Sequence, residues 1–183
     1  PLLQADLMFP GLALDPSGPR VAFSGGGGRV AVLPLAGGPP VELGGFSPHA
    51  EVISVVYADA GRLVAATAWA GPRDDKVVRV WDVATGVARS SSPLPGAGDG
   101  VLGGIRLWPA GAKRALAAVS GQGLLLVELG SLAHRLVAPD VDWLLATNPD
   151  GTLALACASE SPKTCPPELV DLASGRRTAL GDH

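Results

Sequence analysis

The sequence predicts an all-β protein made of four similar units, each with about four short strands. Three observations lead to this prediction. A Gly-containing turn recurs four times, and its glycines are separated by 43, 50 and 40 residues. A second Gly turn keeps nearly the same period, with separations of 49, 44 and 45 residues. Apolar residues nowhere keep helical spacing over a dozen positions without a Gly or Pro, and a period of this size is typical of repeat proteins.

Each unit opens with an apolar run and the first turn. The expected opening strands are Leu12–Leu14, Val52–Tyr57, Val101–Leu107 and Val141–Ala146. The turns that follow them end at Gly18, Gly61, Gly111 and Gly151. A second strand is expected after each turn, at Arg20–Ser24, Leu63–Trp69, Arg114–Ser120 and Leu153–Ser159. Short apolar runs bounded by Gly, Pro and Asp are typical of strands.

Two further strands complete each unit. The third strands are expected at Arg29–Pro34, Val77–Val83, Leu124–Leu129 and Glu168–Leu172. The second kind of turn follows them, at Gly37, Gly86, Gly130 and Gly175. The fourth strands are expected at Val41–Leu43, Val87–Ser90, His134–Ala138 and Arg176–Leu180. Four consecutive strands joined by short turns form an antiparallel meander.

The composition predicts how these meanders pack. Hydrophobic residues make up 47% of the chain and charged residues 17%, so most strands should be buried on both faces. Radial stacking of small sheets around an axis buries both faces of each, which is the architecture of a β-propeller. We therefore expect blades at residues 11–48, 49–100, 101–140 and 141–183, with residues 1–10 holding an outer strand of a preceding blade at Gln4–Phe9.

Four blades raise the question of how the ring closes. An open arc would expose an apolar sheet face at each end, which is more than a monomer normally tolerates. The chain also begins with Pro1 where a translated protein would begin with Met. We therefore expect part of a larger propeller ring, and the alternative is self-association through the open ends.

Charge and motifs exclude several function classes. A net charge of −3 gives no reason to expect nucleic-acid binding. No run of 18 uninterrupted apolar residues occurs, so no membrane span is expected. Nucleophile-elbow, zinc and calcium motifs are missing, and the Gly25–Gly28 run leads into a strand where a phosphate loop needs a helix. We therefore expect no catalytic residue, metal or cofactor, and a protein that is not an enzyme.

Residues 49–86 resemble a tryptophan–aspartate (WD) repeat. The segment opens with His49 and closes with the run Val78–Asp82, whose Trp81 and Asp82 match the signature pair. The resemblance implies a structural hydrogen-bond tetrad that includes His49, Asp75 and Trp81, in which the imidazole accepts the indole N–H. Ala68 stands at the position of the fourth member, with Thr67 beside it.

The first and fourth units resemble the degenerate repeats of Tol-type periplasmic propellers. The resemblance rests on Asn148–Gly151 followed by Asp171–Gly175 in the fourth unit. Both resemblances imply a fold and leave the function open.

Two cysteines lie on the arms of one predicted hairpin. Cys157 and Cys165 flank residues 158–164, so their Cβ atoms can approach to disulfide distance. A disulfide would indicate an extracytoplasmic compartment, whereas two buried thiols would fit the cytoplasm. The hairpin register decides between them, and it does not follow from the sequence.

A long connection follows Trp69 and carries Arg73 and Asp74. An aromatic residue beside an arginine is typical of an interface hot spot, and the alternative is that Trp69 packs under its own loop. The main hypothesis is a non-catalytic scaffold that binds a protein partner through loops at one rim. The alternatives are the propeller portion of a larger enzyme or periplasmic machine, such as a hydrolase, and a propeller that binds a small molecule or polysaccharide.

Overall fold

The computed structural model describes residues 11–25, 27–69, 77–90, 94, 105–119, 121–141, 143–157 and 165–180. These residues form β-strands joined by turns, without a helix among them. The all-β prediction is therefore confirmed. The strand predicted at Gln4–Phe9 lies outside the described residues.

The strands form four antiparallel four-stranded sheets, each a meander in chain order. The first sheet contains β1 (Leu12–Leu14), β2 (Arg20–Gly25), β3 (Arg29–Pro34) and β4 (Val41–Leu43). The second contains β5 (Glu51–Tyr57), β6 (Arg62–Trp69), β7 (Val78–Asp82) and β8 (Ala88–Ser90). The third contains β9 (Ile105–Pro109), β10 (Arg114–Val119), β11 (Gly123–Glu128) and β12 (His134–Ala138). The fourth contains β13 (Trp143–Thr147), β14 (Leu153–Cys157), β15 (Glu168–Asp171) and β16 (Arg177–Ala179).

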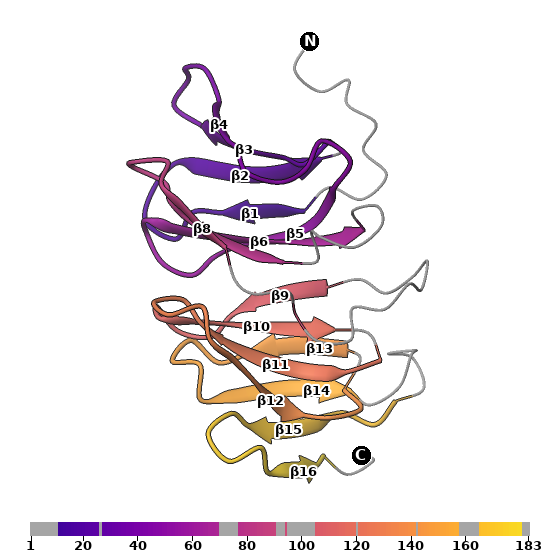
Figure 1. Cartoon of the computed structure of the whole chain (residues 1–183). Helices are drawn as coiled ribbons and strands as arrows, with labels where there is room; N and C mark the ends of the chain where they lie inside the picture. Colours follow the sequence, from indigo (N-terminus) through magenta and orange to yellow (C-terminus); the bar gives the residue numbers. More distant parts are fainter. Residues whose placement is uncertain are drawn as a thin grey trace.

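The sheets follow one another like blades, as predicted for a propeller. The opening strands contact each other in sequence, β1 with β5, β5 with β9 and β9 with β13, so they line a common inner edge. Figure 1 shows the first and fourth sheets at opposite ends of the row. The boundaries predicted between blades stay predictions.

Three apolar clusters fill the spaces between neighbouring sheets. Strand β10 shows how one strand serves two of them. Its residues Ala115, Ala117 and Val119 join the cluster shared with the second sheet, whereas Leu116 and Ala118 join the cluster shared with the fourth. Because successive side chains point to opposite faces, both faces of an inner sheet must be apolar. This explains why the inner strands show little polar alternation.

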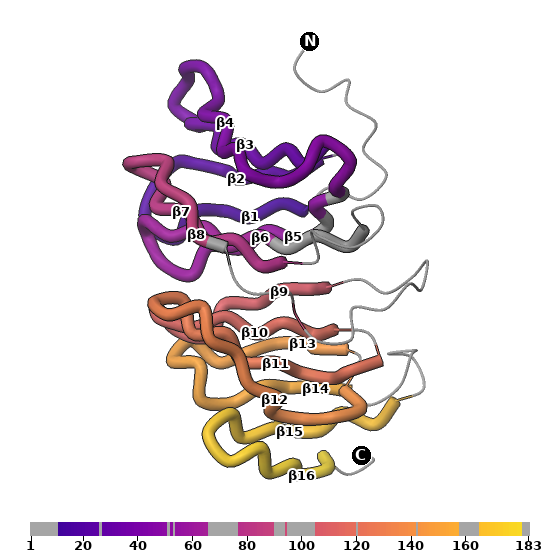
Figure 2. Tube along the Cα trace, viewed as in Figure 1, coloured from indigo at the N-terminus to yellow at the C-terminus, as the bar shows by residue number. Residues whose placement is uncertain are grey.

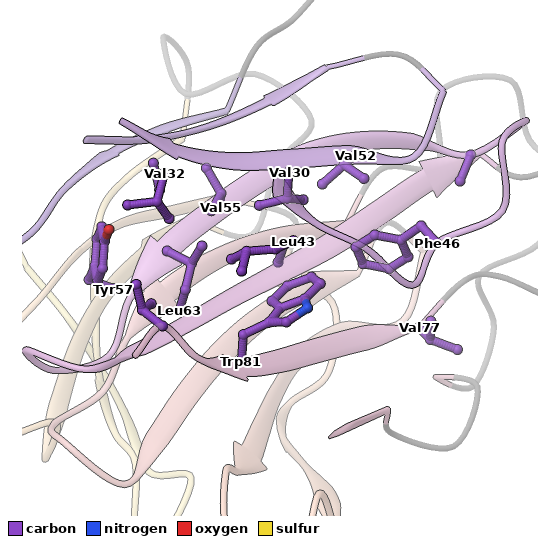
Figure 3. Close-up of a cluster of buried hydrophobic side chains, with 14 residues drawn as sticks. Val30, Val32, Leu43, Phe46, Val52, Val55, Tyr57, Leu63, Val77 and Trp81 are labelled. Carbon is purple, nitrogen blue, oxygen red and sulfur yellow. The ribbon is translucent and has the colours of Figure 1, made fainter. Parts of the chain in front are cut away.

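The cluster between the first two sheets contains the largest fully buried side chain, Trp81. Figure 3 shows its indole near Leu43, the last residue of β4, and near Phe46 in the connection that follows. The Trp81 and Phe46 rings meet edge to face, with centroids 5.6 Å apart. Such aromatic pairs add to the free energy gained from apolar burial.

Two of the recurring glycines, Gly111 and Gly151, lie where turns of the third and fourth sheets meet. Gly151 has a φ of +68°, in the left-handed region, and a Cβ atom there would collide with the Ala110 carbonyl of the third sheet. Thr147 Oγ1 donates to the Pro109 carbonyl at 2.8 Å, which holds the same two turns together. Gly is therefore required at position 151, because the turn conformation and the close approach of the backbones both demand it.

We predict that Gly151→Ala destabilises the protein more than Gly86→Ala, which is a matched control. Gly86 has the same φ of +68°, but a Cβ atom there would meet nothing within 4 Å. The left-handed conformation should cost each variant about 1–2 kcal/mol. The collision with Ala110 should cost Gly151→Ala about 1–3 kcal/mol more. Urea unfolding of both variants measures the difference, and equal losses would contradict the close packing of the two turns.

Candidate interaction rim

The meander gives the stack of sheets two different rims. The turn rim carries the connections between the first and second and between the third and fourth strands of each sheet. The loop rim carries the connections between the second and third strands and those that lead from one sheet to the next. Figure 2 shows the β7–β8, β11–β12 and β15–β16 turns along one side of the molecule. The predicted site residues His49, Trp69, Cys157 and Cys165 all belong to the loop rim.

On the turn rim, acidic side chains are engaged within their own turns. Asp15 Oδ1 accepts hydrogen bonds from the backbone N–H and the hydroxyl of Ser17, and Asp15 also pairs with Arg20. Asp82 accepts from Thr85, and Asp171 accepts from Ser174, in the same manner. These bonds shape the turns and use the acceptors that a ligand would otherwise meet.

The same bonds keep these carboxylates ionised. Hydrogen bonds from Thr85, Thr152 and Ser174 lower the pKa of Asp82, Asp150 and Asp171 respectively. Burial by itself would raise the pKa of Asp15, but hydrogen bonds from Ser17 and Arg20 lower it overall. A carboxyl group with a lowered pKa does not donate a proton near neutral pH. These four carboxylates therefore stay ionised near neutral pH and accept hydrogen bonds within their own turns.

Arginines on the turn rim connect each sheet to the next. Arg20 donates to the Ala60 carbonyl at 2.9 Å, and Arg114 donates to the Gly151 carbonyl at 3.0 Å. From the fourth strands, Arg89 donates to Gly130 and Arg135 donates to Leu172. We had not predicted these bridges. The one sequence feature that hints at these bridges is an Arg at the start of the second strand in three sheets. It is not a reliable guide, because Arg62 of the second sheet pairs with Asp59 of its own turn.

Trp81 has a different partner from the one predicted. Its indole Nε1–H donates to the Gly44 carbonyl at 3.1 Å, and the Trp81 side chain is fully buried. His49, the predicted acceptor, is exposed, and its backbone N–H donates to Ser47 Oγ. A buried indole needs an acceptor, and the chain leaving β4 offers the nearest one across the sheet interface. The bond thus joins two sheets, and since Asp75 lies outside the described residues, the remaining tetrad contacts stay a prediction.

The loop rim holds the two cysteines and the end of β6. Cys157 and Cys165 form a disulfide with a Cα–Cα distance of 5.8 Å, the first of the two alternatives. The bond ties the end of β14 to the segment before β15. Trp69 ends β6, where its backbone pairs with Glu51. The predicted loop residues Arg73 and Asp74 lie outside the described residues.

Within the described residues, no group of three or more His, Cys, Asp or Glu side chains is placed to hold a metal ion. In the same part of the chain, no helix is long and apolar enough to cross a membrane. Tyr57 is the one residue there whose pKa is raised, because burial and the nearby Asp15 charge disfavour its phenolate. Tyr57 lies within the first apolar cluster and therefore serves packing.

Comparison with known proteins finds structures with a similar fold but no curated protein or family with a similar sequence. No family model and no curated protein match the chain. Among solved structures, 679 chains match it, so fold likeness alone does not select a function. One of them is the crystal structure of the tricorn protease, with a TM-score of 0.68 and 13% sequence identity over 96% of this chain. The chain spans 17% of that protein's length.

We predict that Trp81→Ala lowers the free energy of unfolding by about 3–5 kcal/mol, because it leaves a cavity between two sheets. Trp81→Phe fills most of that space and should cost only about 0.5–1.5 kcal/mol, since it loses the hydrogen bond to the Gly44 carbonyl. Trp108→Ala is the control, because Trp108 is only half-buried at the edge of another cluster. An unchanged melting temperature for Trp81→Ala would refute the inter-sheet role of this residue.

We also predict that acid weakens the fold through Asp15. Its pKa in the folded protein lies below the ordinary value of 3.8, so as the pH falls the unfolded chain binds the proton first. The stabilisation is complete above about pH 5 and is lost as the pH falls through the folded pKa. Urea unfolding between about pH 2.5 and 7 should show this loss, and Asp15→Asn should make the profile flatter. A steeper acid loss in Asp15→Asn would contradict the assignment.

Proposed function

We propose that this chain is a non-catalytic scaffold that binds a protein partner through its loop rim. The observation that supports it is the difference between the two rims. The turn rim is made of tight turns whose acidic groups and arginines bond to the turns themselves and to neighbouring sheets. Connections on the loop rim differ in length, from the short connection at residues 26–28 to the long one at residues 91–104. Binding residues tend to gather in such variable loops on a rigid scaffold.

Two features of the loop rim favour a protein as the ligand. In the sequence, Arg73 and Asp74 follow Trp69 within five residues, which is the composition of an interface hot spot. The disulfide between Cys157 and Cys165 restrains a second loop, and a restrained loop loses less entropy on binding. The disulfide also favours an oxidising compartment outside the cytoplasm.

We also propose a distant relationship between these sheets and known propeller repeats. The Val78–Asp82 strand supports a distant relationship of the second sheet to WD repeats, and the fourth sheet has the turn pattern of Tol-type propellers. Many proteins with such repeats serve as interaction scaffolds, which agrees with binding at the rim.

The second candidate is the propeller portion of a larger enzyme. It is favoured by the likeness in fold to part of the tricorn protease, because this chain covers only 17% of that protein's length. Under this hypothesis the loop rim would face a catalytic domain or guide a substrate to it. No described residue favours the third reading, a small-molecule or polysaccharide site in the central channel.

Co-purification from the source cells tests the main proposal. The tagged chain should capture a defined protein, and purified partner should bind it directly. Replacing Trp69 and Arg73 with Ala should weaken binding about 30-fold or more, as expected for hot-spot residues. Arg176→Ala is the matched control, because Arg176 is an exposed arginine on the turn rim and its loss should leave affinity unchanged.

Two results would overturn the proposal. Equal affinity of the loop variant and the native chain would exclude this part of the loop rim. Loss of binding in Arg176→Ala alone would place the interface on the turn rim. Recovery of the native polypeptide with a hydrolase sequence in the same chain, and no separate partner, would favour the second candidate.

A further inference from the structure

Each of the two end sheets has one face that no other described sheet covers. On the first sheet, Leu12, Leu14 and Leu35 are exposed by 66%, 67% and 58%. On the fourth sheet, Leu145 and Leu180 are exposed by 45% and 41%. These two sheets lie at opposite ends of the row (Figure 1). Large apolar side chains gathered on one face of a sheet indicate a contact surface.

The strand register shows that the outer face of the first sheet has apolar residues at the positions that are buried between sheets elsewhere in the chain. In the third sheet, the cross-strand pair Ala117–Leu125 faces the second sheet and is buried. The equivalent pair in the first sheet is Phe23–Ala31, on the face with no neighbour among the described residues. Directly after the third strand, Leu129 and Leu172 are buried against the preceding sheet. Leu35 occupies the same position in the first sheet and is exposed.

The fourth sheet carries the complementary face. In the third sheet, the pair Leu116–Leu126 faces the fourth sheet and is buried at 0% and 2% exposure. The equivalent pair in the fourth sheet, Leu155–Leu169, is only half-buried. Arg135 of the third sheet donates a hydrogen bond to the Leu172 carbonyl of the fourth sheet. The residue at the equivalent position of the fourth sheet is the uncharged Thr178. Its outer face therefore offers leucines without an arginine at that position.

The three internal interfaces all have the same polarity. We call the face of a sheet that points to the next sheet in the chain its forward face, and the opposite face its backward face. In each interface, the forward face of one sheet packs against the backward face of the next. The two open faces are one of each kind, backward on the first sheet and forward on the fourth. A second copy of the chain can therefore cover both by repeating the contact that already holds the sheets together.

We propose that the 183-residue chain dimerises head to tail, with the fourth sheet of each copy packed on the first sheet of the other. Such contacts are heterologous, and two of them close into a ring with twofold symmetry. Two copies of four sheets would make eight blades, within the range known for propellers. Because both contacts form in one ring, the second forms at a high effective concentration. This self-association is independent of partner binding at the loop rim.

Sedimentation equilibrium tests the proposal on the purified chain. The chain has a mass of 18.4 kDa, so the dimer should sediment at about 37 kDa over roughly 1–100 μM. A first variant, Leu12→Glu with Leu35→Glu, blocks the face of the first sheet. A second variant, Leu145→Glu with Leu180→Glu, blocks the face of the fourth. All four leucines are exposed in one copy, so each variant should keep its circular-dichroism spectrum and become monomeric.

Mixing the two blocked variants tests the polarity. Each retains the face that the other lacks, so an equimolar mixture should regain one contact and form a heterodimer. Leu136→Glu is the control and should stay dimeric, since Leu136 is 50% exposed on β12 of the third sheet and pairs with Leu125 on the face toward the second sheet. A monomeric native chain would overturn the proposal. So would a second variant that remains dimeric by itself, because that result would mean that two first sheets pair with each other.

Discussion

The structure depends on the burial of apolar sheet faces against each other. No single four-stranded sheet of this size hides enough surface to be stable alone. Each inner sheet must therefore be apolar on both sides, and β10 shows this most clearly, because alternate residues belong to different clusters. At about 25 cal/mol per Å² of buried apolar surface, these interfaces supply most of the free energy that offsets the chain entropy lost on folding.

Polar contacts then fix how the sheets sit on each other. The indole of Trp81 reaches the carbonyl of Gly44, and the guanidinium groups of Arg114 and Arg135 reach carbonyls of the fourth sheet. Each bond has a backbone acceptor in a turn or connection of the neighbouring sheet. Apolar packing has little directional preference, so these bonds set the position of one blade relative to the next.

The same bonds make the two rims unlike each other. Acceptors such as Asp15 and Asp171 are used within the turns, which leaves that rim tightly structured. The opposite rim carries connections of varied length, including the one restrained by the disulfide of Cys157. The proposed binding at the loop rim rests on this contrast, because connections of varied length on a rigid stack are where binding residues gather.

The sequence by itself determined the four units, their strands and their turns, because these depend on local features: the Gly period and short apolar runs. It also placed the cysteines on facing arms, but the register that pairs Cys157 with Cys165 came from the structure. Only the tertiary structure decided that Trp81 bonds to Gly44, that arginines bridge the sheets and that Leu35 is left uncovered. The physical reason is that each of these depends on a neighbouring sheet, and a pattern within one unit does not specify which backbone groups the next sheet will present.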